Sequence, residues 1–276
     1  MSEAIKLPDD ALRRLQLILL DMLIEVDRIC RKHNIKYKII AGTMLGAVRH
    51  GGFIPWDDDV DVSMLREDYI RFRYVCKTEL NDSKYFFQDD TTDPEYRWGY
   101  ARIRKLNSEF VREGQEHLKM KTGIFIDIFP LDNIPDCYPL RLVHCFECFV
   151  LRKILYSEVG KRNRENSIVR YIYVLLNHIP AQFVFARFRK MSEYWNKHET
   201  TFNRILAFPP RAGWRLGSKR IWDEEMTEIL FENRKFFVTA HYKTVLTWRY
   251  GDYMQLPPPE KRHWHPATKI VFPEED

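Results

Sequence analysis

The chain has 276 residues, of which 45% are hydrophobic and 30% are charged, and its formal net charge is +5 at pH 7. This hydrophobic share excludes global disorder and is enough for the core of one large domain, or of a domain with an insertion. The small basic excess suits an anionic substrate or an anionic membrane surface, but it is too weak to indicate a nucleic-acid partner, so we expect none.

The N-terminal residues and the cysteines indicate a cytoplasmic protein. The first residues, MSEAIKLPDD, lack the apolar stretch of a secretory signal. No uncharged run reaches the roughly 18 residues that a membrane span requires. An odd number of cysteines in a large chain favours reduced thiols over a disulfide framework. They are Cys30, Cys76, Cys137, Cys145 and Cys148.

Three elements are predicted at the start of the chain. Apolar residues at three- and four-residue steps predict an amphipathic helix over residues 9–33. Residues 37–41 are typical of a short strand, and residues 44–49 of a short helix. Gly42 and Thr43 separate the two and would lie in a loop at the helix N-terminus, where amide N–H groups can bind a phosphate.

Residues 42–62, GTMLGAVRHGGFIPWDDDVDV, combine this phosphate loop with four carboxylates. Residues 59–64 alternate as a strand, which places Asp59 and Asp61 on its polar face. Carboxylates are typical Mg²⁺ ligands, and clustered acids repel one another unless a cation neutralises them. We therefore predict that Asp59 and Asp61 bind Mg²⁺ or Mn²⁺. A solvated acidic turn is the alternative.

A helix over residues 66–79 and strands over residues 101–106 and 123–129 are predicted next. Asp127 is the only charged residue in the run GIFIDIFPL. An ionised carboxylate in such a strand needs a partner. We therefore predict that Asp127 is a third metal ligand, or the base that receives the proton of an attacking hydroxyl. An ion pair with a buried arginine is the alternative.

Basic side chains near these strands are candidates for binding the phosphates of a donor. Guanidinium groups match the geometry of phosphate oxygens. Arg49, inside the dense motif, is therefore a predicted phosphate ligand together with Gly42 and Thr43. Arg102 and Arg104 share one face of their strand and are further candidates, with simple solvation of that face as the alternative.

The composition changes after Pro139, where residues 140–206 are rich in Leu, Ile, Phe, Tyr and Arg with few turn residues. We predict a helical insertion over residues 136–217, within a single domain whose core comprises residues 8–135 and 218–276. The core is expected to be a mixed sheet with flanking helices, which is an α/β (α+β) fold.

One stretch of this insertion, residues 168–188, mixes apolar and basic side chains. A buried helix pair that breaks at Pro180 is one interpretation. The other is a surface that touches an anionic membrane, where a lipid-linked acceptor would lie. The residues predicted for this peripheral contact are Arg170, Arg187, Arg189, Lys190, Ile172, Val174, Phe183 and Phe185.

Cysteines and histidines outside the acidic motif are weaker candidates. Cys145 and Cys148 have a zinc-like C-x₂-C spacing close to Cys137, but no second pair follows. Core cysteines are therefore favoured over a zinc site. His263 and His265 lie near the end of the chain as candidate ligands or substrate contacts, although histidines in a polar tail more often have neither role.

The motif of residues 42–61 resembles the signature of the LicD family, with Met44 in place of a leucine. The run FIDIFPLD at residues 125–132 and the run YGDYM at residues 250–254 are also similar to patterns of that family. The resemblance extends over most of the chain and is most specific in its first half. Residues 135–215 agree only in general character.

This resemblance implies a nucleotidyltransferase-like fold, related to the catalytic domains of fukutin-type ribitol-phosphate transferases. It implies transfer of a phospho-alcohol, usually phosphocholine, from a CDP-activated donor to a glycan hydroxyl of a teichoic-acid precursor, lipopolysaccharide or capsule. By the same resemblance Asp59 and Asp61 would bind metal, and Asp127 would be the third ligand or the base. The positions that would contact the donor phosphates are Gly42, Thr43 and Arg49.

Two other functions stay open from the sequence. In a true nucleotidyltransferase the acceptor would attack the α-phosphorus of the donor, and pyrophosphate would be released instead of CMP. A non-catalytic binding or scaffold subunit is disfavoured, because such a protein has no need to keep a cluster of mutually repulsive carboxylates.

Overall fold

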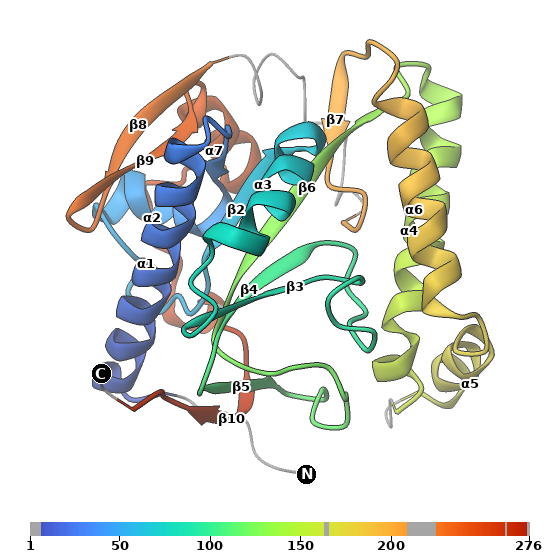
Figure 1. The fold of residues 1–276 in the computed structure, drawn as a ribbon, viewed down its shortest axis with the longest axis horizontal. Coiled ribbons are helices and arrows are strands. Elements are labelled where there is room, and N and C mark those ends of the chain that lie inside the picture. The colour runs from blue at the N-terminus through green and yellow to red at the C-terminus, as the bar shows by residue number, and fades with distance from the viewer. Residues whose placement is uncertain (1–6, 163–165, 209–224, 263, 275–276) are drawn as a thin grey trace.

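The centre of the fold is one mixed β-sheet, and the computed structural model describes residues 7–162, 166–208, 225–262 and 264–274. The strands follow the order β1-β2-β6-β4-β3, and β7 pairs with β6 (Figure 1). Strands β2 and β6 are parallel and the other pairs in this sheet are antiparallel, which confirms the predicted α/β class. The strands are β1 (Lys38–Ile39), β2 (Asp61–Leu65), β3 (Tyr85–Gln88), β4 (Ala101–Lys105), β6 (Phe125–Ile134) and β7 (Phe202–Arg204).

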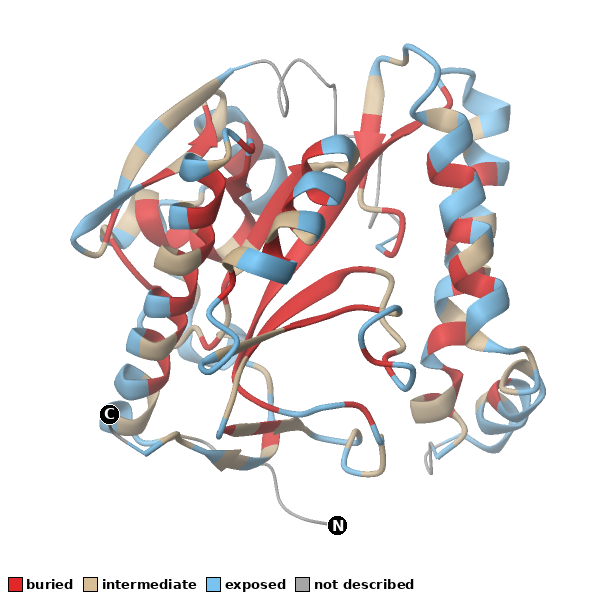
Figure 2. Ribbon diagram, in the orientation of Figure 1, coloured by how far each residue is buried: buried red, intermediate tan, exposed pale blue. Residues whose placement is uncertain are grey.

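Strand β6 is the longest of the described strands, and every residue in it is buried (Figure 2). A strand covered on both faces reads as a nearly continuous apolar run, and FIDIFPLDNI fits that pattern at most positions. Its two acids are the exceptions, and each is paired with an arginine. Asp127 pairs with Arg102, and Asp132 pairs with Arg66.

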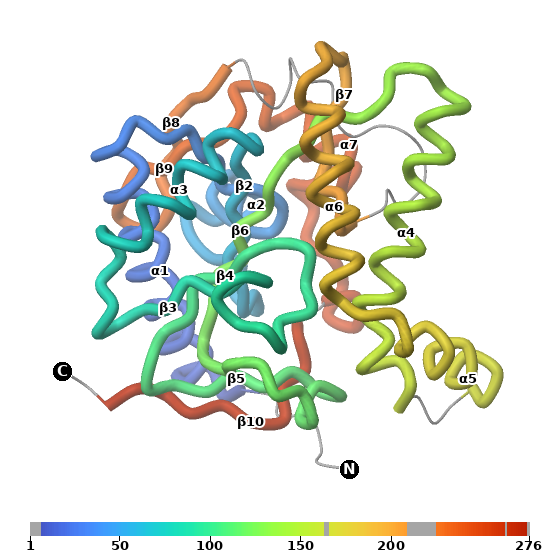
Figure 3. Tube along the Cα trace, turned by 45° about the vertical axis from the view of Figure 1, so that its right-hand side comes forward, coloured from blue at the N-terminus to red at the C-terminus, as the bar shows by residue number. Residues whose placement is uncertain are grey.

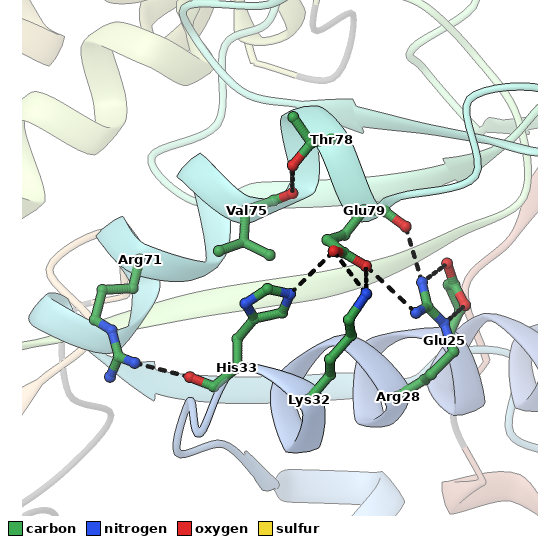
Figure 4. Close-up of polar contacts among 8 residues, drawn as sticks. All are labelled: Glu25, Arg28, Lys32, His33, Arg71, Val75, Thr78 and Glu79. Carbon is green, nitrogen blue, oxygen red and sulfur yellow. Dashed lines mark hydrogen bonds and ion pairs between the residues drawn. The ribbon is translucent and has the colours of Figure 1, made fainter.

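Helices α1 (Asp9–Lys32) and α3 (Arg66–Glu79) pack against each other and against β6. Near their C-terminal ends Glu79 accepts hydrogen bonds from Lys32 and pairs with His33 (Figure 4). Exposed ion pairs of this kind contribute about 1 kcal/mol or less, so the apolar stripe of α1 is the main cause of the packing. Its buried residues include Leu15, Leu19, Met22, Leu23, Val26 and Ile29.

Helices α4 (Tyr138–Gly160), α5 (Ser167–Leu176) and α6 (Ala181–Trp195) lie on the side of the sheet opposite α1 (Figures 1 and 3). α4 and α6 run side by side and enclose a second apolar core, separate from that of the sheet. Within the described residues, no single helix is long and apolar enough to span a bilayer. The second core consists of Ile134, Cys148, Leu151, Ile154, Leu155, Val184, Phe185, Phe188, Met191 and Leu206.

The end of β6 joins the sheet to these helices through Asp132, which is fully buried. Its carboxylate accepts hydrogen bonds from Arg66 at 2.5 and 2.7 Å, from Ser192 Oγ at 2.6 Å and from Asn196 Nδ2 at 2.7 Å. Burial of a carboxylate is costly unless it is paired and hydrogen-bonded, and this one is. Asp132 therefore links α3, β6 and α6 at one point.

The C-terminal part of the chain returns to the first strands. Strands β8 (Met226–Phe231) and β9 (Arg234–Thr239) form a hairpin whose strands lie next to α2 (Ala41–His50) and β1. Helix α7 (Tyr242–Tyr250) follows and packs near α2. Strand β10 (Ala267–Val271) then pairs with β5 (Glu109–Arg112). This return brings residues beyond 240 close to the acidic motif.

Some predicted boundaries were wrong. The strand expected over residues 37–41 is limited to β1, because a helix already begins at Ala41. The strand expected over residues 59–64 begins only at Asp61. Strand β7 interrupts the stretch that was expected to be entirely helical. Position 218, where the second part of the core was expected to begin, lies outside the described residues, and the division into core and insertion stays a prediction.

The residues expected to contact a membrane do not form one surface. Phe185 is buried in the second core. Arg187 pairs with Glu147, and Arg189 pairs with Asp90 at 2.5 Å. The pattern in the sequence was misleading here because α6 uses one face to pack against α4, and its basic residues are held by acids of neighbouring segments.

Candidate active site

Helix α2 (Ala41–His50) carries the first half of the acidic motif. Ala41 opens it with a positive φ of 51°. Gly42 and Thr43 therefore lie in the first turn of the helix and not in a loop before it, which corrects the predicted boundary. First-turn N–H groups have no acceptor within their own helix, so this end of α2 is suited to an anion such as a phosphate.

Gly42 and Thr43 also hold the acidic loop in place. Thr43 is buried, and its Oγ1 accepts a hydrogen bond from the backbone N–H of Asp61 at 2.9 Å. A Cβ atom at Gly42 would lie only 2.9 Å from Oδ2 of Asp57, so a larger residue would displace that side chain. Gln16 of α1 donates to the backbone carbonyl of Asp57 at 3.0 Å. The loop is thus fixed from two helices.

Asp61 and Asp127 are partners in the parallel pairing of β2 and β6. Partners in a parallel ladder point to the same side of the sheet. Oδ1 of Asp127 accepts a hydrogen bond from Nε of Arg102 at 2.7 Å, and both side chains are buried. This is the ion pair that the sequence left open as the alternative. A role of Asp127 as metal ligand or base stays a prediction.

Burial and mutual repulsion act together on the acidic loop. Burial raises the pKa of Asp57 and of Asp61 well above the ordinary range, and the neighbouring carboxylate of Asp59 adds to both shifts. Burial also raises the pKa of Asp59, while the nearby His265 opposes the rise. Carboxylates in such surroundings are stabilised when a cation neutralises them.

The donor atoms that lie closest together belong to Asp58, Asp59 and His265, all within 4.8 Å of one another. Nδ1 of His265 lies 2.9 Å from Oδ1 of Asp58 and 3.3 Å from Oδ2 of Asp59. Carboxylate oxygens suit Mg²⁺ and Mn²⁺, and imidazole suits several transition metals. The residues present therefore fit a divalent metal.

The metal ligands predicted from the sequence are only partly brought together. Within the described residues, this is the single group of three or more such side chains at that spacing, and it contains neither Asp61 nor Asp127. Metal binding by Asp59, Asp61 and Asp127 stays a prediction. His265 was a candidate ligand or substrate contact in the sequence, with neither role favoured. His263 lies outside the described residues.

Two arginines that are not among the predicted site residues lie near enough for their charges to act on Asp61. Burial raises the pKa of Asp61, and the positive charges of Arg249 in α7 and Arg112 in β5 oppose that rise. Arg249 directly precedes the YGDYM run, a signal that could have identified it. The sequence around Arg112 has no comparable motif, since its position depends on the pairing of β5 with β10.

Arg49 joins α2 to the C-terminal segment. Its NH1 group donates to the backbone carbonyl of Tyr253 at 3.0 Å. Close by, the guanidinium of Arg262 lies 4.3 Å from the centroid of the Trp56 ring, next to the acidic loop. The segment around residues 250–262 therefore covers one side of the motif. Contact between Arg49 and a donor phosphate stays a prediction.

Arg102 and Arg104 are buried in the sheet instead of being solvated on its surface. Arg104 donates to Oε1 of Gln88 at 2.6 Å and to the carbonyl of Gly123 at 2.7 Å. Burial, together with the positive charge of Arg102, lowers the pKa of Arg104 to about 9. Both guanidinium carbons lie over the ring of Phe125, at 3.8 and 4.7 Å from its centroid. A phosphate contact for either arginine stays a prediction.

The zinc-like cysteines form no metal-binding group within the described residues. Cys148 is buried in the second core, and burial raises the pKa of its thiol to about 12. Sγ of Cys145 accepts a hydrogen bond from Arg204 at 2.8 Å, and Cys137 is exposed. The interpretation as core cysteines is therefore confirmed for Cys148.

The chain is similar to one known protein family and to known bacterial proteins. Residues 34–142 match the family model described as LicD/FKTN/FKRP, nucleotidyltransferase domain. The lipopolysaccharide cholinephosphotransferase LicD of Haemophilus influenzae is 30% identical over 267 residues, which cover 92% of this chain and 95% of that protein. An uncharacterised protein of Rickettsia prowazekii is 44% identical over 144 residues, which cover 52% of this chain and 48% of that protein.

The family match includes the parts of the site that come from the sheet and from α2. It spans Gly42, Thr43, the acidic loop and Asp127, whereas Arg249 and His265 lie beyond it. The similarity to the Haemophilus protein is longer, because the 30% identity extends over nearly the whole length of both chains. The chain therefore belongs to the LicD family.

Proposed function

We propose that this protein transfers a phospho-alcohol, most simply phosphocholine, from a CDP-activated donor to a hydroxyl of a glycan and releases CMP. The observation that carries the proposal is the convergence of a helix N-terminus, a half-buried acidic loop and the charges of two arginines in a chain related to a named cholinephosphotransferase. The name of that relative supports lipopolysaccharide as the acceptor. A teichoic-acid precursor and a capsular glycan are alternative acceptors, because each also offers a glycan hydroxyl.

The donor end of the site would be formed by α2 and its neighbours. In this proposal the first-turn N–H groups at Gly42 and Thr43 bind the diphosphate of the donor. Arg112 and Arg249 supply positive charge beside the same acidic loop, which offsets the repulsion between diphosphate and carboxylates. Arg49 completes the edge of the site next to the C-terminal segment.

The acceptor end would be formed by the sheet. Asp127, held in one orientation by Arg102, receives the proton of the acceptor hydroxyl as its oxygen attacks the distal phosphorus. The bond between that phosphorus and the oxygen of CMP breaks in the same displacement. Asp59 and Asp61, with Asp58 and His265 nearby, would hold Mg²⁺ or Mn²⁺, which when bound offsets negative charge on the transferred group.

The test is a transfer assay that identifies the products. Purified protein is incubated with CDP-choline, Mg²⁺ or Mn²⁺ and lipopolysaccharide that lacks phosphocholine, and the phosphorus products are followed by NMR. CMP and a new phosphodiester are expected from the wild type and from Asp82→Asn, which changes an exposed acid in the turn between α3 and β3. Asp127→Asn is expected to abolish both products. Absence of CMP with every CDP-alcohol tried would sink the proposal.

A nucleotidyltransferase is the second candidate, and the description of the matched family model supports it. Such an enzyme would consume a nucleoside triphosphate and release pyrophosphate. The same assay with CTP in place of CDP-choline separates the two functions. Pyrophosphate release from CTP, with no CMP from CDP-choline, would replace the proposed reaction by this one.

A further inference from the structure

The helical part of the molecule exposes an apolar surface that the proposed reaction does not use. In α5, Ile168 is 73% exposed, Ile172 49% and Leu175 53%. Isolated apolar residues on a surface are common, but a contiguous apolar patch marks an interaction site. Helix α5 projects at the end of the helical part in two views that differ by 45° (Figures 1 and 3).

Helix α5 packs on the second half of α4, whereas the exposed apolar stripe of α4 lies on its first half. Tyr173 is the one buried residue of α5, and it packs on Gly160, where any Cβ atom would clash with its ring. Its hydroxyl accepts a hydrogen bond from Lys153 at 3.0 Å, which holds α5 to α4. Further apolar residues of α4 recur at three- and four-residue steps and are exposed, which places them on one stripe. They are Leu142, Val143, Phe146 and Phe149.

The geometry of α5 and α6 disfavours a membrane span and suits a helix that lies on a membrane. By length and composition the two helices would pass together as a spanning segment, but they are bent by 76°. α6 also buries Val184, Phe185 and Phe188 in the second core, so it is not free to enter lipid. Helix α5 packs Leu176 against the edge of that core and Tyr173 on α4, and its remaining, exposed face can lie in the plane of an interface.

The charges around this surface identify the kind of lipid. The basic residues of the described segments 152–162 and 166–182 outnumber the acids, and one of them, Lys161, pairs with the acid Glu158. Basic residues around an apolar helix are typical of attachment to anionic membranes. The basic residues are Arg152, Lys153, Lys161, Arg162 and Arg170.

We propose that α5 forms a docking surface for an anionic lipid membrane, into which its exposed apolar side chains insert. This inference rests on exposure, packing and charge, and it does not depend on which group the active site transfers. It keeps the part of the earlier expectation that falls on α5, namely Arg170, Ile172 and Val174, and drops the part that falls on α6.

The test measures binding of the full chain to vesicles, without donor or acceptor. Wild type is sedimented with vesicles of phosphatidylglycerol and phosphatidylcholine, or of phosphatidylcholine alone, at low and high salt. Binding to the anionic vesicles is expected, and it should weaken as salt rises. Ile172→Glu/Leu175→Glu should weaken it at least tenfold. The matched control is Ile70→Glu/Tyr74→Glu, an exposed apolar pair on α3, which should bind as the wild type does.

A second measurement needs no variant. Hydrogen exchange of the wild type, with and without anionic vesicles, should show protection in α5 and none in α3. Lack of binding at low salt, or equal binding by the α5 variant, would overturn the proposal. A wild-type dimer that the α5 substitutions dissociate would assign the surface to a second copy of the chain instead. Transfer to a soluble acceptor should be the same in the α5 variant and the wild type, so the two proposals can fail separately.

Discussion

Asp61 lies among other acids and next to two arginines, so its charge affects both stability and reaction. Asp61→Asn removes one charge from the repulsive group and should leave the melting temperature unchanged or higher. Transfer should fall about 100-fold or more, because several kcal/mol of charge stabilisation at the reacting phosphate is lost. Both quantities are measured in parallel with Asp82→Asn, whose carboxylate is exposed. Near wild-type turnover in Asp61→Asn would remove this residue from the site.

Thr43 tests whether the start of β2 depends on a single hydroxyl. Thr43→Val keeps the shape of the side chain but leaves the N–H of Asp61 without its acceptor at 2.9 Å. A buried unsatisfied donor costs about 1–3 kcal/mol. Thr43→Ser keeps the hydroxyl and should lose much less. The comparison is the free energy of unfolding in urea, and equal values for Val and Ser would show that the bond is not needed.

Which residues make up the site could be predicted only in part from the sequence. The acidic loop, Gly42 and Thr43 were found because they are close together in the chain and carry a recognisable pattern. The sequence proposed an ion pair for Asp127 without naming Arg102, since the partners are 25 residues apart. The approach of His265 to Asp58 across 207 positions depends on the whole fold, and no local pattern encodes it.

The joint between β6 and α6 is the group of hydrogen bonds that Asp132 accepts from Arg66, Ser192 and Asn196. The attachment of the helical part to the sheet depends most on this joint. Burial alone would raise the pKa of Asp132, but Arg66, Ser192 and Asn196 hold it below its ordinary value. Asp132→Asn leaves Arg66 without its partner and should lower the free energy of unfolding by about 3–5 kcal/mol at pH 7. Glu109→Gln, which breaks an exposed pair with Lys269, should cost less than about 1 kcal/mol.

The same joint has a defined pH dependence. A lowered pKa means that the stabilisation is complete above the unfolded-state value of about 4 and is lost as the pH falls through the folded-state value. The difference in unfolding free energy between wild type and Asp132→Asn should therefore be constant from pH 7 to pH 5 and shrink towards pH 3. A difference that grows on acidification would contradict this assignment.

Long periodic elements were predictable, and short ones were not. Helix α1 was predicted within about one residue of its bounds, and α3 was predicted at the bounds that the structure has. Strands β3, β5, β8, β9 and β10 and helix α7 were missed. These elements are short and have mixed composition, so their structure depends on pairing with distant strands, as β10 does with β5.

Ligand binding should stabilise the molecule as a whole, because the proposed site uses both ends of the chain. CDP-choline with Mg²⁺ should raise the melting temperature, and much less so after EDTA is added. Free ligand at a hundred times its Kd adds about 2.7 kcal/mol to the unfolding free energy. Asp61→Asn, measured in the same scans, should lose most of the metal-dependent part. Equal shifts with every nucleoside triphosphate, and none with CDP-choline, would favour the nucleotidyltransferase.

The unbroken strand β6 has one more consequence. It carries Asp127 of the site and, five positions further on, Asp132 of the joint that anchors the helical part. Five residues of strand measure about 16 Å, and a strand buried throughout has little freedom to bend. If the protein docks through α5, this strand acts as a rigid spacer that keeps the active site at a fixed distance from the membrane. Sugars would then be selected by their distance from the bilayer as well as by their identity.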